Sequence, residues 1–133
     1  MGGPSREHEV SLKSGENVFA RLNPEKYETK KVLIGKNGDW EIEPRNLKKH
    51  ADIAFLALHG RFGEDGTVQD ILENHEIPYT GSGILASALG MNKFLSLRHF
   101  SDGGLTVPPT VFITKDELFQ DTHAIFKNLK NLF

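Results

Sequence analysis

The chain has 133 residues, with 16 basic and 18 acidic side chains and a formal net charge of -2. Because no long block of one charge occurs, the charge pattern does not favour an electrostatic nucleic-acid binder. Cysteine is absent, which excludes disulfides and thiolate metal sites, and no apolar run is long enough to span a bilayer. We therefore expect a soluble, cytoplasmic protein with neither nucleic acid nor membrane as a partner.

The first third of the chain predicts a helix followed by two strands. Turn residues at Gly2–Ser5 precede apolar positions with helical spacing from His8 to about Leu22. Residues 27–34 are strand-like, and Asn37-Gly38 predicts a tight turn into a strand at Trp40–Ile42. This order is typical of the opening of an α/β domain.

A strongly apolar stretch, Ile53–Leu58, predicts the central strand of a parallel sheet, buried on both faces. The segment His59–Gly66 follows directly and combines an imidazole, two carboxylates and several glycines. Ligands of open α/β sheets bind outside the carboxyl ends of the strands. This loop is therefore where we expect a small-molecule site.

Shorter elements follow this loop. Thr67-x-x-Asp70 resembles a capping box that opens a helix to about His75, with an apolar stripe that includes Val68 and Leu72. Ile77–Thr80 predicts a short strand, and Ile84–Leu89 predicts a helix with Gly90 as its C-cap.

The last part of the chain predicts two more helices around a short strand. Asn92 is expected to cap a helix from Lys93 to about Phe100, and Val111–Ile113 is strand-like. Thr114-x-x-Glu117 is a capping box for an amphipathic helix. The alternation of strands and helices indicates an α/β sheet with helices on its faces. The apolar face of the last helix is formed by Leu118, Ile125, Leu129 and Leu132.

Four sequence blocks carry a family resemblance: Gly2–Gly15, His59–Gly66, Ile77–Gly83 and Ala86–Lys93. In this order they resemble the D-alanine–D-alanine ligases, which are ATP-grasp enzymes that make a dipeptide of peptidoglycan. The resemblance implies a three-layer Rossmann-like pre-ATP-grasp domain with a parallel sheet over residues 1–96, lacking its first strand. It also implies the start of an ATP-grasp domain over residues 97–133. Both ends of the chain are expected to be cut.

The resemblance implies roles for individual residues. Glu7 is expected to be a catalytic-site residue that helps to hold the ammonium of the first D-alanine through charge-assisted hydrogen bonds. His59 is expected in the same subsite, where an imidazole can donate to a carboxylate or to an oxyanion. Ser11, Gly81 and Ser82 are expected to contribute to the substrate pocket.

Structural interpretations of these residues stay open beside the functional ones. Glu7 and Glu9 both lie at the amino end of a helix, where the helix dipole favours a carboxylate. His59 could simply end a buried strand. Glu64 and Asp65 are adjacent carboxylates without further ligands nearby, which is a poor magnesium site, so we expect them to shape the loop.

By resemblance, Lys93 is expected to approach the ATP phosphates, because a flexible ammonium suits a polyphosphate. The alternative is that Lys93 is a solvent-exposed lysine of a helix without a role in binding. ATP and Mg²⁺ are the implied cofactors, with the metal ligands outside this chain. The implied activity is ATP-dependent ligation of two D-alanines through an acyl phosphate, by a full-length homodimer, with this chain inactive alone. Two alternatives stay open: a standalone binding module without catalysis, and a ligase that makes D-alanyl-D-lactate or D-alanyl-D-serine.

Overall fold

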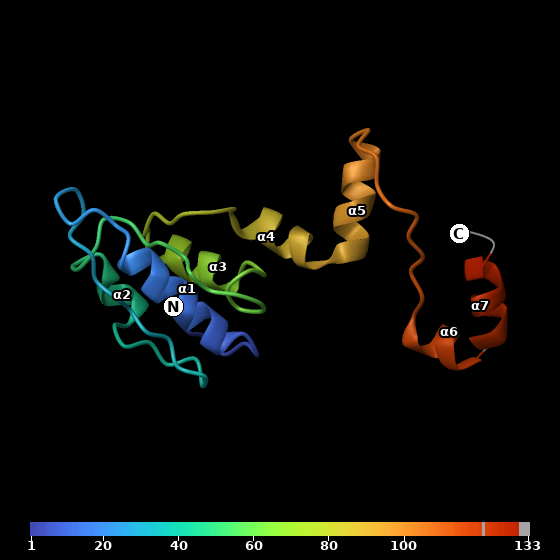
Figure 1. Ribbon diagram of the computed structural model, residues 1–133, viewed down its shortest axis with the longest axis horizontal. Coiled ribbons are helices and arrows are strands. Elements are labelled where there is room, and N and C mark those ends of the chain that lie inside the picture. The colour runs from blue at the N-terminus through green and yellow to red at the C-terminus, as the bar shows by residue number, and fades with distance from the viewer. Residues whose placement is uncertain (121, 131–133) are drawn as a thin grey trace. The chain divides into compact units, whose positions relative to one another are not determined.

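The computed structural model describes residues 1–120 and 122–130, which fall into two compact units, Met1–Met91 and Asn92–Phe133. The predicted domain boundary after residue 96 stays a prediction. No helix in this described part of the chain is long and apolar enough to cross a membrane. The helices are α1 (His8–Phe19), α2 (Pro44–Leu47), α3 (Thr67–Asn74) and α4 (Ile84–Met91) in the first unit, and α5 (Lys93–Asp102), α6 (Lys115–Gln120) and α7 (Thr122–Lys130) in the second (Figure 1).

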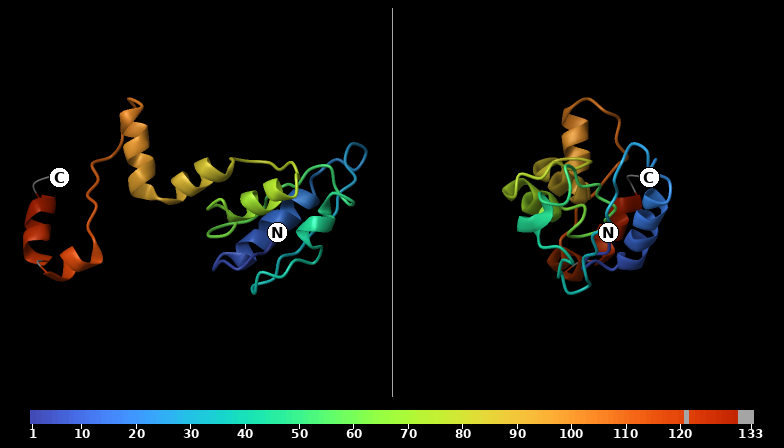
Figure 2. Two further views of the ribbon diagram at one scale, coloured as in Figure 1. Left: turned by 180° about the vertical axis from the view of Figure 1, so that it is seen from behind. Right: turned by 90° about the vertical axis from the view of Figure 1, so that its left-hand side faces the viewer.

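Extended segments alternate with the helices of the first unit, as an α/β chain requires. In the end-on view of Figure 2, α1 lies on one side of these segments and α2 and α3 lie on the other. The predicted parallel sheet, however, is not built from continuous strands in residues 1–120 and 122–130. The extended segments meet only at isolated bridges, which join Gly2 to Ile34 in parallel, Ile34 to Trp40 in antiparallel and Ala54 to Tyr79 in parallel.

The core of the first unit forms where α3 packs against the extended segments. Val68 and Leu72 are 0% and 1% exposed, and they cluster with Ile34, Leu58 and other buried residues. Full burial of such a side chain contributes about 1.5–3 kcal/mol, so this contact is a main source of stability. The helical stripe predicted for this segment is confirmed at both positions.

The prediction that Ile53–Leu58 is covered on both faces is wrong for its first half. Ala57 and Leu58 are each 7% exposed, but Ile53 and Phe55 are 57% and 55% exposed. One edge of this segment pairs with residues 78–80 through the Ala54 backbone. Ile53 and Phe55 both line a cavity, which leaves these two side chains half-exposed.

Two helix ends differ from the sequence expectations. The capping box at Thr67 does not form, because Gly66 is the N-cap of α3, at a φ of 95°. The preceding Asp65 provides the local acceptor instead, since its Oδ1 accepts a hydrogen bond from the Thr67 N–H at 3.1 Å. Gly90 does not end α4, which continues to Met91.

In the second unit, both predicted N-terminal caps are confirmed. Asn92 Oδ1 accepts the Leu95 N–H at 3.1 Å. Glu117 Oε2 accepts the Thr114 N–H at 2.7 Å, and Thr114 Oγ1 accepts the Glu117 N–H at 3.2 Å. The helix that follows is divided into α6 and α7 rather than continuous, and Leu132 of its predicted apolar face lies outside the described residues.

Candidate functional site

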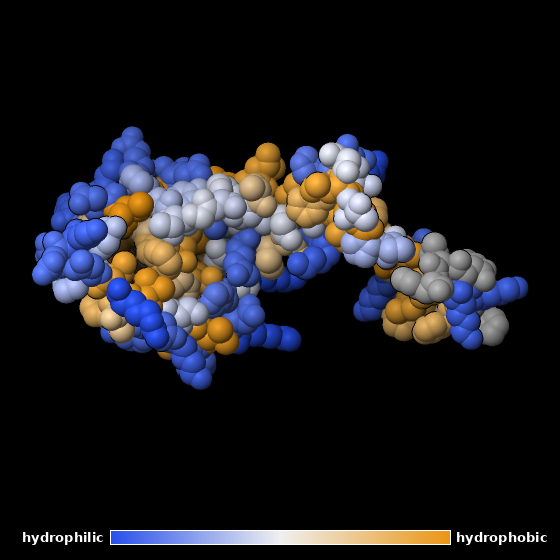
Figure 3. All heavy atoms as spheres, turned by 45° about the horizontal axis from the view of Figure 1, so that its top comes forward, coloured by the Kyte–Doolittle hydropathy of each residue, from blue (hydrophilic) through white to orange (hydrophobic). Residues whose placement is uncertain are grey.

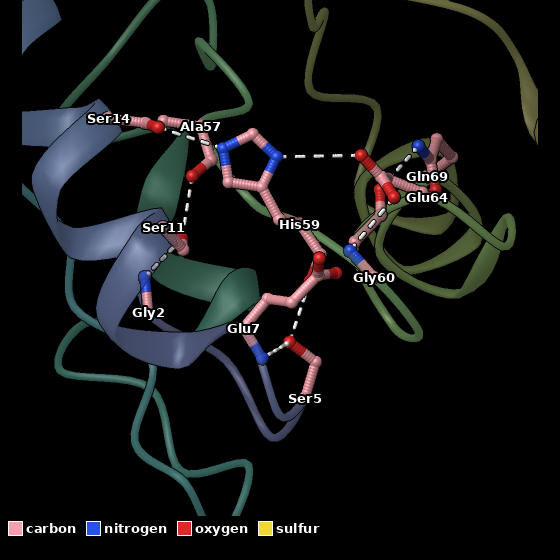
Figure 4. Close-up of polar contacts among 11 residues, drawn as sticks. Gly2, Ser5, Glu7, Ser11, Ser14, Ala57, His59, Gly60, Glu64 and Gln69 are labelled. Carbon is pink, nitrogen blue, oxygen red and sulfur yellow. Dashed lines mark hydrogen bonds and ion pairs between the residues drawn. The ribbon is translucent and has the colours of Figure 1, made fainter.

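The amino end of α1 meets the loop 59–66, which places two of the predicted site residues side by side (Figure 4). Ser5 makes the connection. Its hydroxyl donates to the His59 carbonyl at 2.7 Å and accepts the Glu7 N–H at 3.0 Å. One short side chain therefore fixes the backbone of Glu7 relative to that of His59, which is 52 positions later in the sequence.

The Glu7 carboxylate lies directly against the backbone of Gly60. Gly60 has a φ of +72°, and a Cβ built on it would come within 2.5 Å of Glu7 Oε2. A side chain at this position would therefore be strained and would displace the carboxylate. Glu7 is exposed to solvent, so its charge is available to a small ligand.

Both nitrogens of the His59 ring have a polar contact. Nε2 lies 2.8 Å from Ser14 Oγ, and Nδ1 lies 3.5 Å from Glu64 Oε1. The other Glu64 oxygen accepts the Gly60 N–H at 2.9 Å. With the proton on Nδ1, the ring faces Glu64 as a donor and accepts the Ser14 hydroxyl. These partners set the orientation of the imidazole.

Asp65 and Gln69 give the loop its shape. Asp65 accepts hydrogen bonds from the N–H groups of Phe62 and Thr67, at 2.9 and 3.1 Å. Burial alone would raise the pKa of Asp65, but these hydrogen bonds outweigh it and lower the pKa below its usual value. Gln69 is buried and donates to the Gly63 carbonyl at 3.0 Å. The expected loop-shaping role of Asp65 agrees with these contacts.

Ser11 is fully buried and its hydroxyl joins two backbone groups. Oγ accepts the Gly2 N–H at 2.8 Å and donates to the Ala57 carbonyl at 2.6 Å. The side chain thus links α1 to both neighbouring extended segments. Its predicted contact with substrate stays a prediction, and the proposal below does not use it.

The remaining predicted site residues belong to other elements of the chain than this cluster. Gly81 and Ser82 are exposed in the loop before α4, where the Ser82 carbonyl accepts the Ser87 hydroxyl at 3.2 Å. Within residues 1–120 and 122–130, no hydrogen bond or ion pair joins them to Glu7 or His59. Lys93 is exposed at the first position of α5, in the second unit. The roles of these three residues stay predictions.

Ser14 is a site residue that the sequence analysis missed, although a signal for it exists. Glu7, Ser11 and Ser14 are spaced i, i+4 and i+7, so they share the face of α1 that meets segment 57–60. Glu64 was expected only to shape the loop, yet it also faces the His59 ring. The result is an exposed carboxylate beside an oriented imidazole, which suits a small zwitterion.

Comparison with known proteins identifies the family. A family model described as the D-ala D-ala ligase N-terminus matches residues 1–50 and 41–82, which together span more than half of the chain. A D-alanine–D-alanine ligase of Pelotomaculum thermopropionicum is 44% identical over 92% of this chain and 37% of that protein. One of Geobacter sulfurreducens is 45% identical over 88% of this chain and 36% of that protein. The chain thus spans about a third of the length of these curated relatives.

Solved structures agree with the sequence relatives. The D-alanine–D-alanine ligase from Coxiella burnetii has a TM-score of 0.83 and 26% identity, over 98% of this chain and 46% of that one. The VanG D-Ala:D-Ser ligase from Enterococcus faecalis has a TM-score of 0.73 and 28% identity, over 98% and 47%. These likenesses accord with the α/β class. The chain belongs to the D-alanine–D-alanine ligase family and corresponds to its N-terminal part.

Proposed function

We propose that this chain provides the first D-alanine subsite of an ATP-dependent D-alanine–D-alanine ligase. The observation that carries the proposal is the contact of the exposed Glu7 carboxylate with Gly60, next to the oriented His59 ring. Family membership supports the same assignment, because the relatives are named for this activity. The proposal concerns a longer protein, since the chain spans only about a third of its relatives.

The two side chains suit the two ends of a D-alanine zwitterion. Glu7 pairs with the ammonium, and His59 donates from Nδ1 to the carboxylate. Glu64 Oε1 lies on that side of the imidazole, 3.5 Å from Nδ1, which is long for a hydrogen bond, so the contact is weak. Substrate binding accordingly turns Glu64 away from the ring. The bound amino acid is then oriented with its carboxylate toward the loop 59–66.

The proposed reaction joins two D-alanines. The carboxylate of the first D-alanine receives a phosphoryl group from ATP, and the amine of the second attacks the acyl phosphate and releases phosphate. The residues of this chain contribute binding and orientation, which remove much of the entropic barrier of a bimolecular step. We propose that His59 also donates to the oxyanion of the tetrahedral intermediate.

The described residues offer a contact for ATP but no binding site for Mg²⁺. The exposed ammonium of Lys93, at the amino end of α5, fits a contact with an ATP phosphate, because ammonium and helix end both favour an anion. Mg²⁺ does not fit the described residues, since residues 1–120 and 122–130 contain no group of three His, Cys, Asp or Glu side chains that could hold a metal ion. No step is therefore assigned to a metal held by this chain.

A D-alanyl-D-serine ligase is a second candidate, favoured by the likeness to the VanG D-Ala:D-Ser ligase. Both candidates use D-alanine first, so the subsite proposed here is common to them. They differ in the second substrate. Turnover of the full-length enzyme with D-alanine alone, compared with turnover after addition of D-serine, distinguishes the two.

The subsite is tested by titrating the chain with D-alanine and following the amide signal of Gly60 by NMR. Glu7→Gln keeps the size of the side chain and removes its charge, so we expect D-alanine to bind roughly tenfold more weakly. Glu9→Gln is the matched control, because Glu9 is two positions later in the sequence and pairs with Lys36 at 2.9 Å on the surface. Equal effects of the two variants would leave Glu7 with only a helix-end role.

A further inference from the structure

The helix α1 has an apolar side and a polar side, and Ser14 belongs to the polar side. Gly15, Val18 and Phe19 line the apolar cavity of the first unit, whereas Ser14 is not among the described residues that line it. Figure 3 shows apolar residues gathered on this unit with hydrophilic residues around them. The Ser14 hydroxyl meets the His59 ring instead, with 2.8 Å between Oγ and Nε2 (Figure 4). Packing against the cavity therefore does not account for a serine at this position.

The Ser14 hydroxyl makes this contact in place of a local one. A serine inside a helix commonly turns its hydroxyl back to the carbonyl four positions earlier. Among residues 1–120 and 122–130, however, the His59 ring is the single hydrogen-bond partner of the Ser14 hydroxyl. The contact is half-buried and joins residues that are 45 positions apart, so it belongs to the tertiary structure and not to the helix alone.

Two other serines fix the backbone on both sides of this contact. Ser11 Oγ, three positions before Ser14 on α1, donates to the Ala57 carbonyl at 2.6 Å. Ser5 Oγ donates to the His59 carbonyl at 2.7 Å. The helix and the segment that carries His59 are thus tied together before any ligand binds, and Ser14 meets the ring from a fixed position. Such preorganisation lowers the entropic cost of orienting a binding group.

Glu64, the partner of the other ring nitrogen, is held less firmly. Its Oε1 lies 3.5 Å from His59 Nδ1, and its side chain is 48% exposed. The carboxylate of a bound D-alanine takes the same side of the ring in the proposed subsite, because it also accepts from Nδ1. Glu64 therefore gives way in the complex, while the contact with Ser14 stays.

The two contacts favour the same form of the neutral imidazole. A neutral imidazole has a proton on one nitrogen and a lone pair on the other. The Glu64 carboxylate favours the proton on Nδ1, because a carboxylate repels a lone pair that faces it. The Ser14 hydroxyl, which can donate or accept, then donates to Nε2. The hydrogen bond that one ring nitrogen makes sets the protonation of the other.

We propose that Ser14 is a positioning residue that keeps the proton of His59 on Nδ1, so that the ring presents a donor to the carboxylate of the first D-alanine. The inference rests on the proposed D-alanine subsite and adds the residue that selects the donor atom. Without the Ser14 hydroxyl the proton can move to Nε2, and Nδ1 then turns a lone pair toward the substrate carboxylate. Ser14 itself touches no substrate in this scheme and acts only through the ring.

The nitrogen NMR spectrum of the His59 imidazole tests this inference, because protonated and unprotonated ring nitrogens resonate far apart. The chain is prepared with isotope-labelled histidine, and the His59 signals are identified by their loss in His59→Asn. The pH is raised until the signals stop moving, so that the neutral ring is observed. We expect Nδ1 to carry the proton in the parent chain, and we expect Ser14→Ala to shift the population toward Nε2. Ser14→Thr keeps a hydroxyl and should restore the Nδ1 form.

Titration with D-alanine, followed through the Gly60 amide signal, gives a second readout. We expect Ser14→Ala to bind D-alanine about two- to tenfold more weakly, which corresponds to the loss of one hydrogen bond, and Ser14→Thr to bind it as the parent chain does. Asn17→Ala is the matched control on α1, because Asn17 is exposed and its side chain accepts a hydrogen bond from Arg21. The control should change neither the position of the ring proton nor the affinity.

Two results would overturn the inference: a parent ring that is protonated on Nε2, or a ring proton that stays on Nδ1 in Ser14→Ala. A different result separates the inference from the proposed function. If the parent chain has the Nδ1 form and Ser14→Ala loses it, but neither chain binds D-alanine, then the proposed subsite is wrong and the control of the ring proton by Ser14 stands.

Discussion

Replacement of Ser11 by alanine tests the central link in this structure. Ser11 is 0% exposed, and its hydroxyl satisfies the buried Gly2 N–H and the Ala57 carbonyl at once. The substitution removes both hydrogen bonds and leaves two backbone groups without these partners. A buried unsatisfied group costs about 1–3 kcal/mol, so we expect the free energy of unfolding to fall by about 2–4 kcal/mol. This is a large part of the 5–15 kcal/mol that is typical of a domain.

The loss is measured by urea denaturation followed through the fluorescence of Trp40, with the Tm from circular dichroism as a second reading. For a unit of this size the expected loss lowers the Tm by about 10 °C or more. Ser14→Ala is the matched control on the same helix, because the Ser14 hydroxyl meets the His59 ring rather than buried backbone. If the two variants prove equally stable, the Ser11 bridge does not hold α1 to the extended segments, and the reasoning fails.

Three further outcomes are expected. Gly60→Ala should weaken D-alanine binding by displacing the Glu7 carboxylate and should destabilise the fold by about 1–2 kcal/mol. The control Gly38→Ala changes a glycine of similar φ that has nothing within 4 Å of its Cβ position, so it should lower stability without affecting binding. Equal loss of D-alanine binding in the two variants would contradict the contact between Glu7 and Gly60. The hydrogen bond to Glu73 raises the pKa of Tyr79 to about 12, with smaller contributions from burial and from the Glu73 charge. The stabilisation of the fold by this hydrogen bond is therefore present below the unfolded pKa of tyrosine and is lost as the pH rises through the folded pKa. Ultraviolet titration of Glu73→Gln should show a lower pKa for Tyr79. The 133-residue chain should release phosphate from ATP only at background with D-alanine, since it spans 37% of a relative's length; steady turnover would contradict the proposed division of the enzyme.

Much of the local structure could be predicted from neighbouring residues. The cap at Asn92 and the box between Thr114 and Glu117 are closed by groups three positions apart, so the sequence contains both partners. The buried stripe of α3 follows from helical spacing alone, because Val68 and Leu72 must share a face. Family membership was likewise visible in four ordered blocks, and the family comparison confirms it.

Contacts between residues far apart in the sequence determined the features that the sequence analysis did not predict. The contacts of Ser11 with Ala57 and of Ser14 with His59 join residues 46 and 45 positions apart, so the sequence pattern did not predict them. The apolar character of Ile53 and Phe55 predicted burial, but both side chains line a cavity and stay half-exposed, because no other part of the described chain covers them. The sequence determines which residues favour the interior, while only the tertiary structure determines whether another segment is present to cover them.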